Sequence, residues 1–224
     1  MEIHNHNRWR IRRRDFLAFS AGLVAAISFG DLSSAEVSHA AGAKFPEGRC
    51  EGKTEKKVLV AYASKYGSTG GVAEAIGREL CSQEVAADMA SIDNARDIGS
   101  YQGVVVGSAI YRGRWMSEAV DFVKKNKDTL RQVPVAYFLV CMTLSRPTEK
   151  NRIQVLSYME PVLAAVPEIK PVALGTFAGA LDYSNLSWPD KKILKYKGTP
   201  EGDFRDFEAI HAWAREPLHA KFFP

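Results

Sequence analysis

Apolar residues along this 224-residue chain follow two alternating patterns that begin at residue 58. Short continuous apolar runs are typical of strands that are buried on both faces of a sheet. Runs of this kind predict strands at 58–62, 85–89, 103–107, 133–140 and 172–177, of which 85–89 has the weakest pattern. The run at 103–107 is Gly-Val-Val-Val-Gly, so we expect this strand at the centre of the sheet.

Between these runs, apolar residues recur three or four positions apart, which is the spacing of one face of a helix. This spacing predicts helices at 69–81, 116–130, 149–166 and 204–215, and a short helix or loop at 95–101. We expect Pro161 to divide or kink the third of these helices. The predicted core-facing positions after residue 115 are Met116, Ala119, Val120, Val123, Leu130, Ile153, Leu156, Met159, Leu163, Phe207, Ile210 and Ala214.

Strands that alternate with helices predict an α/β fold in which helices cover both faces of a parallel sheet. Five strands favour the smaller doubly wound arrangement, with strand order 2-1-3-4-5. Ligands of such sheets bind beyond the carboxyl ends of the strands, where the winding direction changes. The loops after the first, third and fourth strands are therefore the candidate site.

The first 35 residues form a leader of different composition. Residues 1–14 are basic, and residues 16–30 are apolar and uncharged, which is shorter than the roughly 20 residues of a membrane span. Arg13-Arg14-Asp15-Phe16-Leu17 resembles the twin-arginine export motif R-R-x-F-L, so we predict a signal peptide at 1–35 and a periplasmic or other extracytoplasmic protein. An uncleaved anchor or a basic tail before an ordinary helix are the alternatives. We expect residues 36–56 to form a linker or an ordered arm outside the sheet, followed by a single domain at 57–224.

The net charge of +4 comes partly from this leader. Residues 1–35 contain five of the 30 basic residues and three of the 26 acidic ones, which leaves 25 against 23, or +2. A nearly neutral domain gives no reason to expect nucleic-acid binding. It also differs from the strongly acidic surface of an electron carrier that docks to basic partners.

The turn after the first strand has the composition of a phosphate site. It reads Ser64-Lys65-Tyr66-Gly67-Ser68-Thr69 and leads directly into a predicted helix. Hydroxyl groups, a glycine and the positive end of a helix dipole together favour phosphate binding. Neither G-x-x-x-x-G-K-[ST] nor G-x-G-x-x-G is present here, which argues against an ATPase and against a dinucleotide fold.

The other two loops complete a mononucleotide site. The loop after the third strand, 108–115, is aromatic and cationic and suits a flat conjugated ring, and the loop after the fourth strand starts at Cys141. Phosphate next to a ring is what FMN presents. Tyr111 is a candidate to stack on the ring and Arg112 to offset the charge of a reduced flavin.

Together, the strand and turn at 58–69, the loop at 103–114, Phe177-Ala-Gly-Ala-Leu181 and Gly202-Asp-Phe-Arg-Asp-Phe207 resemble the flavodoxin-domain family. Within this family the chain is more similar to the branch that contains the menaquinone-dependent protoporphyrinogen IX oxidase. The resemblance covers the chain from about residue 57 and implies a flavodoxin-like fold with one non-covalent FMN. The implied cofactor-binding residues are Ser64, Lys65, Tyr66, Gly67, Ser68, Thr69, Ser108, Ala109, Ile110, Tyr111, Arg112, Gly113, Cys141, Met142, Thr143 and Leu144.

An insertion at about 182–203 separates the fifth strand from the last helix. Its segment 186–197 alternates apolar or aromatic residues with lysines. Such a segment could lie on anionic lipid or at the rim of a quinone or porphyrin site. The alternative, which we favour, is a solvated connection whose aromatic side chains pack back on the domain.

Histidine, cysteine and aspartate residues outside these loops suggest structural roles. The five histidines lack metal-ligand spacing, and we expect His211 at the surface or in packing. Three cysteines in an exported protein allow one disulfide. Cys50–Cys81 is the favoured pair, because Cys141 follows the fourth strand at the candidate site. Asp203 and Asp206 are expected to cap or form ion pairs rather than to act as an acid/base pair.

These patterns favour an FMN-dependent oxidoreductase or electron-transfer protein whose partner is a quinone or a redox protein. One form is a protoporphyrinogen IX dehydrogenase; another is a one-electron carrier or a quinone or small-molecule reductase. Export argues against the first form, because haem synthesis is expected on the cytoplasmic side. The alternative from a different class is a non-redox binding or scaffold protein that has lost FMN.

Overall fold

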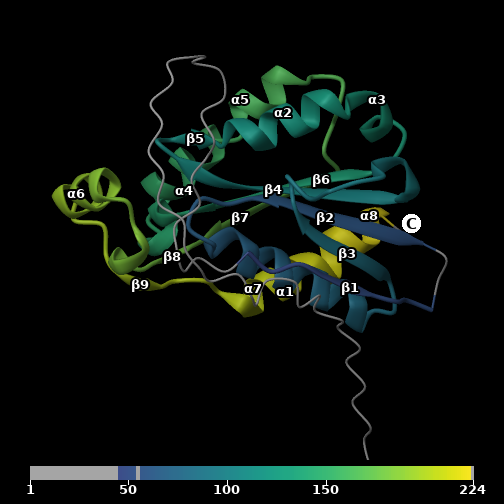
Figure 1. Ribbon diagram of the computed structural model, residues 1–224, viewed down its shortest axis with the longest axis horizontal. Helices are drawn as coiled ribbons and strands as arrows, with labels where there is room; N and C mark the ends of the chain where they lie inside the picture. The colour runs from purple at the N-terminus through teal and green to yellow at the C-terminus, as the bar shows by residue number, and fades with distance from the viewer. Residues whose placement is uncertain (1–44, 54–55, 223–224) are drawn as a thin grey trace, which may run out of the picture.

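The computed structural model describes residues 45–53 and 56–222, which form an α/β fold around a mostly parallel sheet (Figure 1). The five strands that pair in parallel are β2 Lys57–Ala63, β3 Ala86–Ser91, β4 Gly103–Tyr111, β6 Val135–Cys141 and β7 Ala173–Ala178. They lie in the order β3-β2-β4-β6-β7. Numbered along the chain as parallel strands, this is the order 2-1-3-4-5.

Two short antiparallel strands bring the sheet to seven strands within the described residues. β1 Gly48–Cys50 pairs with β3 at one edge, and β5 Arg114–Trp115 folds back on the end of β4. The expectation that 36–56 lies outside the sheet is therefore wrong for 48–50, and the predicted number of strands is too small. β1 pairs antiparallel with β3, and β5 pairs antiparallel with β4. Both partners are strands that the apolar pattern had predicted.

Alternation along the buried strands divides the core into two layers. Val58, Val60 and Tyr62 of β2 face one side, and Leu59 and Ala61 face the other. On the first side lie α1 Ser68–Ser82, α7 Phe207–Trp213 and α8 His219–Phe222, and on the second lie α2 Ser117–Lys125, α3 Lys127–Leu130, α4 Glu149–Ser157 and α5 Glu160–Ala165. Figure 1 shows α2, α3 and α5 above the sheet and α1 and α7 below it.

The predicted helix at 149–166 divides into α4 and α5, with Pro161 in the first turn of α5. The core buries Val155, Met159, Val162 and Val166 of this segment, and Tyr158 and Leu163 pack against it, so Met159 and Leu163 lie inward as expected. Ile153 and Leu156, expected to point inward, are 62% and 58% exposed. The predicted helix at 204–215 starts later, at Phe207, which is also exposed, and continues through a π-helical stretch, Ala214–Leu218, into α8.

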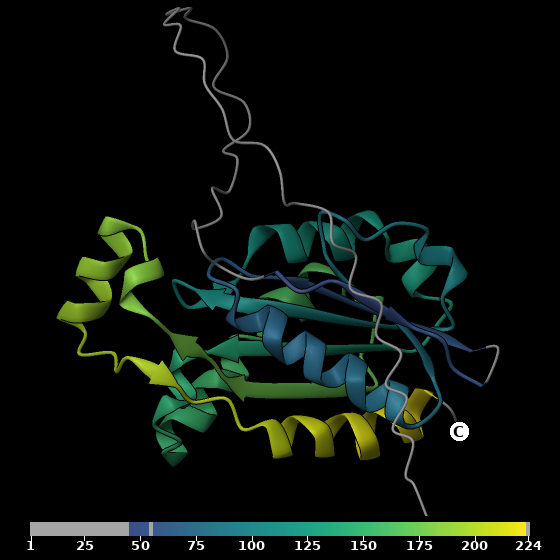
Figure 2. The same ribbon diagram turned by 60° about the horizontal axis from the view of Figure 1, so that its bottom comes forward.

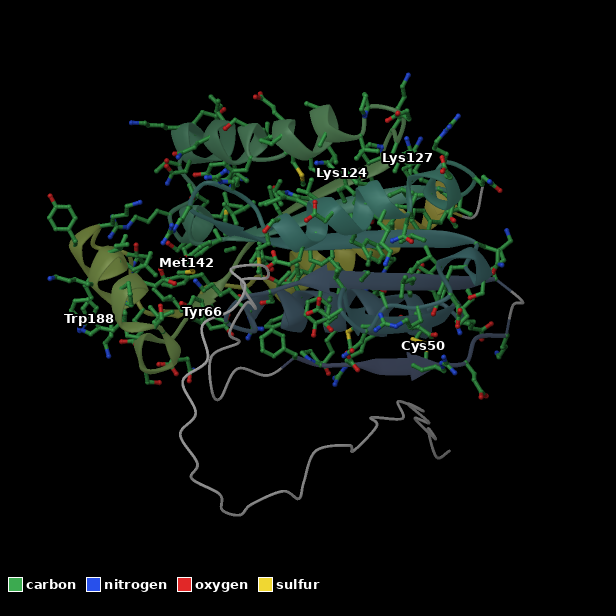
Figure 3. All side chains as sticks on the ribbon, turned by 45° about the horizontal axis from the view of Figure 1, so that its top comes forward. Cys50, Tyr66, Lys124, Lys127, Met142 and Trp188 are labelled. Carbon is green, nitrogen blue, oxygen red and sulfur yellow. A yellow bond between two sulfur atoms is a disulfide. The ribbon has the colours of Figure 1, made fainter. Side chains whose placement is uncertain are left out.

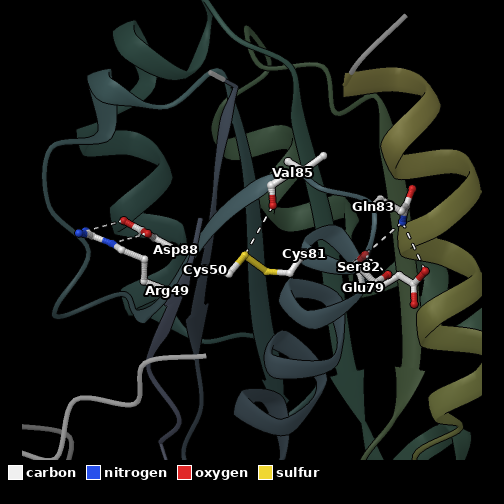
Figure 4. Close-up of a disulfide and its surroundings, with 8 residues drawn as sticks. All are labelled: Arg49, Cys50, Glu79, Cys81, Ser82, Gln83, Val85 and Asp88. Atoms are coloured by element: carbon white, nitrogen blue, oxygen red, sulfur yellow. Dashed lines mark hydrogen bonds and ion pairs between the residues drawn. A yellow bond between two sulfur atoms is a disulfide. The ribbon is translucent and has the colours of Figure 1, made fainter. Parts of the chain in front are cut away.

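A disulfide joins Cys50 at the end of β1 to Cys81 in α1, as the sequence predicted (Figure 4). Arg49 beside it forms a two-pronged ion pair with Asp88 of β3, with N–O distances of 2.8 and 2.9 Å. Tyr62 donates a hydrogen bond to the carbonyl of Pro46 at 2.9 Å. The arm before the domain is thus fixed to it by a covalent bond, a backbone ladder and side chains.

The insertion contains α6 Trp188–Tyr196 and is closed at its base by a separate antiparallel pair, β8 Ala180–Leu181 and β9 Gly202–Asp203. Figures 1 and 2 show α6 projecting from the end of the sheet at which the parallel strands finish. Short 3-10 turns, Ile98–Ser100, Met142–Ser145 and Tyr183–Asn185, connect other elements. No helix among the described residues is long and apolar enough to cross a membrane.

Candidate functional site

A pocket lies beyond the carboxyl ends of β2, β4 and β6, between these strand ends and α6. Most of the residues predicted to bind the cofactor line it: Ser64, Lys65, Tyr66, Ser68, Thr69, Ala109, Ile110, Tyr111, Arg112, Cys141 and Met142. The parallel strands all end at this edge, so three loops that are distant in sequence meet there. Gly67, Ser108, Gly113, Thr143 and Leu144 are not among the lining residues.

The turn at 64–69 leads into α1 with the geometry of an anion site. Gly67 adopts a left-handed φ of 85°, and its N–H donates to Ser64 Oγ at 3.0 Å. No side chain caps the amino end of α1, and no acidic residue lies in its first turn. The first N–H groups of the helix and the positive end of its dipole are thereby left to an anion.

Thr69 adds a polar group without a hydrogen-bond partner in the described part of the chain. Its side chain is fully buried, and its Oγ1 makes no hydrogen bond within the described residues. A buried hydroxyl without a partner is costly, and such groups in proteins are usually satisfied by a ligand or by water. Ser68 Oγ, by contrast, accepts a hydrogen bond from the Ala180 N–H at 2.7 Å, which connects the turn to β8.

The predicted ring loop is a tight hairpin rather than an open loop. β4 continues to Tyr111, and Arg112 and Gly113, with φ of 53° and 79°, connect it to β5. Positive φ at both central residues is typical of a type I′ turn, which suits the twist of paired strands. Ser108 is fully buried: its hydroxyl donates to the Ala109 carbonyl at 2.8 Å and accepts from the Met116 N–H at 2.9 Å. Its hydroxyl therefore braces the hairpin.

The loop after β6 contributes Cys141 and Met142 to the pocket wall. Burial raises the pKa of the Cys141 thiol, so this free cysteine is held in its neutral form. Thr143 and Leu144 point elsewhere: the Thr143 hydroxyl lies 3.4 Å from the Tyr158 hydroxyl, and Leu144 packs on the core. This is the loop for which the predicted residues fit the pocket least.

Several pocket residues were not among those predicted from the sequence: Val140, Gly179, Ala180, Leu181, Asp190, Ile193, Leu194 and Lys197. Asp190 of α6 is the charged acid among them. Its side chain is buried and accepts from Lys65 Nζ at 2.9 Å, from the Tyr111 hydroxyl at 2.9 Å and from the Tyr66 hydroxyl. Burial opposes ionisation of Asp190, but hydrogen bonds from Tyr66, Lys65 and Tyr111 outweigh it and lower its pKa to about 2. One signal was available, because Asp190 is the sole acid among the lysines of 186–197.

The same contacts fix the ring of Tyr111. Lys65 Nζ lies 3.8 Å from the centre of this ring, and the Arg112 guanidinium lies 5.1 Å from it. The hydroxyl at the far end of the ring is held by Asp190. A hydrogen bond at the hydroxyl and cation–π contacts over the ring therefore fix the position of Tyr111.

Outside the pocket, the structural roles predicted for two other groups are confirmed. Asp206 caps α7 by accepting from the Ala209 N–H at 2.9 Å, and Asp203 forms an ion pair with Arg205. His211 lies 3.0 Å from Glu79 between the last helix and α1. The part of the chain that the structure describes contains no cluster of residues suited to a metal ion.

Residues 59–206 match a family model described as a flavodoxin domain, and this match spans more than half of the chain. The chain belongs to the flavodoxin-domain family. Two curated relatives are protoporphyrinogen IX dehydrogenases [quinone]. The protein of Escherichia coli K12 is 29% identical over 174 residues, which is 73% of this chain and 95% of the relative. The protein of Leishmania major is 26% identical over 172 residues, 71% of this chain and 74% of the relative.

Among solved structures, oxidised flavodoxin 2 from Bacillus cereus is similar to this flavodoxin domain with a TM-score of 0.44 and 21% identity. The similarity covers 73% of this chain and 99% of that one. The family match ends at residue 206 and begins at 59, so it includes the turn at 64–69, the hairpin at 111–114 and the whole insertion. Residues 1–44, with the predicted export signal, lie outside the described residues.

Proposed function

We propose that this protein is an FMN-dependent oxidoreductase that transfers electrons to a quinone. The observation that carries the proposal is the Thr69 hydroxyl, which is buried at the uncapped start of α1 and has no hydrogen-bond partner among the described residues. A phosphate monoester supplies acceptors for both this hydroxyl and the first N–H groups of the helix. The family match and the quinone-linked relatives support the same assignment.

A bound flavin supplies the electron-carrying chemistry, and the protein supplies its position and electrostatic environment. In this proposal the turn at 64–69 binds the phosphate, while Tyr111 and Met142 provide walls for the ring. Lys65 and Arg112 both lie against the Tyr111 ring, so stacking would use the part of the ring that they leave open. Arg112 places a positive charge at the same wall, where it favours an anionic reduced ring.

The first experiment measures colour and cofactor release. Purified protein should absorb at flavin wavelengths and release FMN on denaturation. Thr69→Val removes only the partnerless hydroxyl, so we expect roughly tenfold weaker FMN binding with little loss of stability of the apoprotein. Thr129→Val, the same change in α3, is the control. A colourless protein that FMN cannot reconstitute would instead support the non-redox binding protein.

The second experiment addresses the substrate. The similarity to protoporphyrinogen IX dehydrogenases makes protoporphyrinogen IX the first substrate to test, with menaquinone analogues as acceptors. Oxidation above the uncatalysed rate supports the dehydrogenase. If the flavin is bound and no oxidation occurs, the protein is a carrier or a reductase for other substrates.

We also propose that α6 contacts the membrane surface where a quinone is found. The interpretation that its aromatic residues pack on the domain is wrong, since Trp188 is 73% and Tyr196 94% exposed. Lys191, Lys192 and Lys195 lie on the same short helix, and basic helices with exposed aromatic residues bind anionic lipid.

Sedimentation with anionic and zwitterionic vesicles tests this contact. The double variant Trp188→Ala/Tyr196→Ala should lose binding to anionic vesicles. Ile153→Ala, which removes an exposed apolar residue from α4, is the control. Equal sedimentation of the wild type and the double variant would exclude α6 as the membrane contact.

Export by the twin-arginine route remains part of the proposal. The Cys50–Cys81 disulfide supports it, because such bonds persist in oxidising compartments. Replacing Arg13 and Arg14 by lysine should leave the precursor in the cytoplasm. Cell fractionation measures where the variant is found. Unchanged export would contradict the twin-arginine signal.

A further inference from the structure

We infer that Asp190 is a positioning residue that latches the insertion over the pocket, through Lys65 of the phosphate turn and Tyr66 and Tyr111 at the pocket wall. Lys65 and Tyr66 come from the turn at 64–69 and Tyr111 from the end of β4, and the carboxylate comes from α6. The latch therefore connects α6 to both halves of the candidate site. The latch itself is a property of the protein alone, and its effect on the cofactor rests on the proposed function.

The insertion has the construction of a hinged flap. At its base, β8 and β9 pair through Ala180↔Asp203 and Leu181↔Gly202, and the Phe204 N–H donates to the Gly179 carbonyl at 3.1 Å. Inside it, Tyr183 binds both the Glu201 side chain and the Thr199 carbonyl. The segment is thus braced within itself and tied at its base, and α6 projects beyond the sheet (Figures 1 and 2).

The contacts of α6 with the turn at 64–69 and the hairpin converge on one place. Besides Asp190, the preceding Ser187 approaches Tyr66, with its Oγ 3.2 Å from the Tyr66 hydroxyl. The outer side of the helix carries Trp188, which Figure 3 places at the outer edge, whereas Tyr66 lies between α6 and the sheet. Ile193, Leu194 and Lys197 of the same segment line the pocket. Releasing Asp190 would therefore remove one wall of the pocket.

Burial makes this latch depend on all its members. Asp190 is 6% exposed, and the Lys65 side chain is largely covered as well. A buried carboxylate is stable only while it is paired and hydrogen-bonded, so the closed position of α6 is favoured as long as Lys65 and the two hydroxyls stay in place. Movement of the helix outward gives both charges back to water.

Hydrogen exchange of the apoprotein tests the latch without any cofactor. In Asp190→Asn we expect amides of 188–196 to exchange at least about tenfold faster, as expected for the loss of a charge-assisted hydrogen bond. Amides of β4 should keep their wild-type rates, and Asp121→Asn, the same change at an exposed position of α2, is the control. Tyr111→Phe removes a single hydroxyl and should act in the same direction if Asp190→Asn does not fold.

The loaded protein supplies a second readout. FMN should dissociate faster from Asp190→Asn, and its visible bands should shift because Tyr111 is no longer held; Asp190→Glu should restore part of both. Unchanged exchange of α6 in Asp190→Asn and in Tyr111→Phe would overturn the latch. Faster exchange in a protein that never binds FMN would support the latch and overturn the proposed function instead.

Discussion

Two buried aspartates tie two peripheral segments to the same domain, with similar chemistry and different support. Asp88 accepts from Arg49, Lys57 and Tyr101, and Asp190 accepts from Lys65, Tyr66 and Tyr111. The arm held through Asp88 also has a backbone ladder and a disulfide. By contrast, α6 contacts the candidate site through hydrogen bonds of Asp190 and Ser187 with the side chains of Lys65, Tyr66 and Tyr111. Asp88 therefore belongs to the permanent fold, and Asp190 to a part that can open.

Removing the disulfide should have the largest effect on stability. The bond joins residues 31 apart in sequence, and loop-closure entropy gives a stabilisation of about 3–4 kcal/mol for a loop of this length. We expect Cys50→Ala/Cys81→Ala to lower the free energy of unfolding by about 3 kcal/mol in urea titrations. A loss below about 1 kcal/mol would mean that the ladder and Asp88 hold the arm without the covalent bond.

The Asp88→Ala variant should show the second largest loss of stability. It leaves Lys57 without its partner at 2.7 Å and removes the acceptor for Arg49 and Tyr101. Arg49 is largely exposed and can return to water, so we expect a loss of about 2 kcal/mol rather than the larger cost of a fully buried pair. Urea titration measures it, with Asp121→Ala as control. Equal stability of the two variants would place Asp88 outside the permanent fold.

Asp190→Ala should lower the free energy of unfolding by about 1 kcal/mol or less, which is a smaller loss than that of Asp88→Ala. The reason is that α6 can move outward and expose Lys65 to water. Its effect should instead be local and appear as cleavage by trypsin at Lys191, Lys192 or Lys195 under native conditions. Wild-type protein should resist at these sites for longer. If Asp190→Ala unfolds the protein as Asp88→Ala does, the comparison between the two aspartates fails.

Acid should produce the smallest change, through the closure of α6. The folded-state pKa of Asp190 is depressed to about 2 from the ordinary 3.8, so its contribution to closure is complete above pH 3.8 and is lost as the pH falls through about 2. We expect pepsin to cleave within 188–196 increasingly from pH 4 to pH 2. In Asp190→Asn, cleavage within 188–196 should already occur at pH 4, and it should not show this increase as the pH falls to 2.

The sequence predicted the five parallel strands from their apolar runs, of which the run that contains Asp88 was the weakest, and it placed the candidate site because such strands end at one edge. For 149–166 the predicted inner face was right for Met159 and for Leu163, which packs on the core, and wrong for Ile153 and Leu156. Val155, Met159, Val162 and Val166 also follow a helical spacing, and this is the set that the core buries. Two overlapping apolar faces cannot be separated by periodicity alone.

The remaining errors depend on contacts between distant residues. Gly48–Cys50 carries no apolar pattern, and it becomes a strand only because β3 is available beside it. Asp190 lies 125 residues from Lys65, and their approach requires the insertion to fold back over the start of α1. Ser108 was predicted from its position after a strand, but β4 continues to Tyr111 and turns its hydroxyl inward. The local sequence pattern predicts the strands. The hairpin and the latch depend on contacts that form only in the folded domain.

The pairing of β8 with β9 has a consequence for protein engineering. Because Leu181 is the direct partner of Gly202, the two ends of segment 182–201 lie one strand spacing apart, about 5 Å. A gap of that size is closed by a two-residue turn such as Asn-Gly. The insertion is therefore a replaceable module: it can be cut out or exchanged for another sequence while the sheet and the turn at 64–69 keep their own connections.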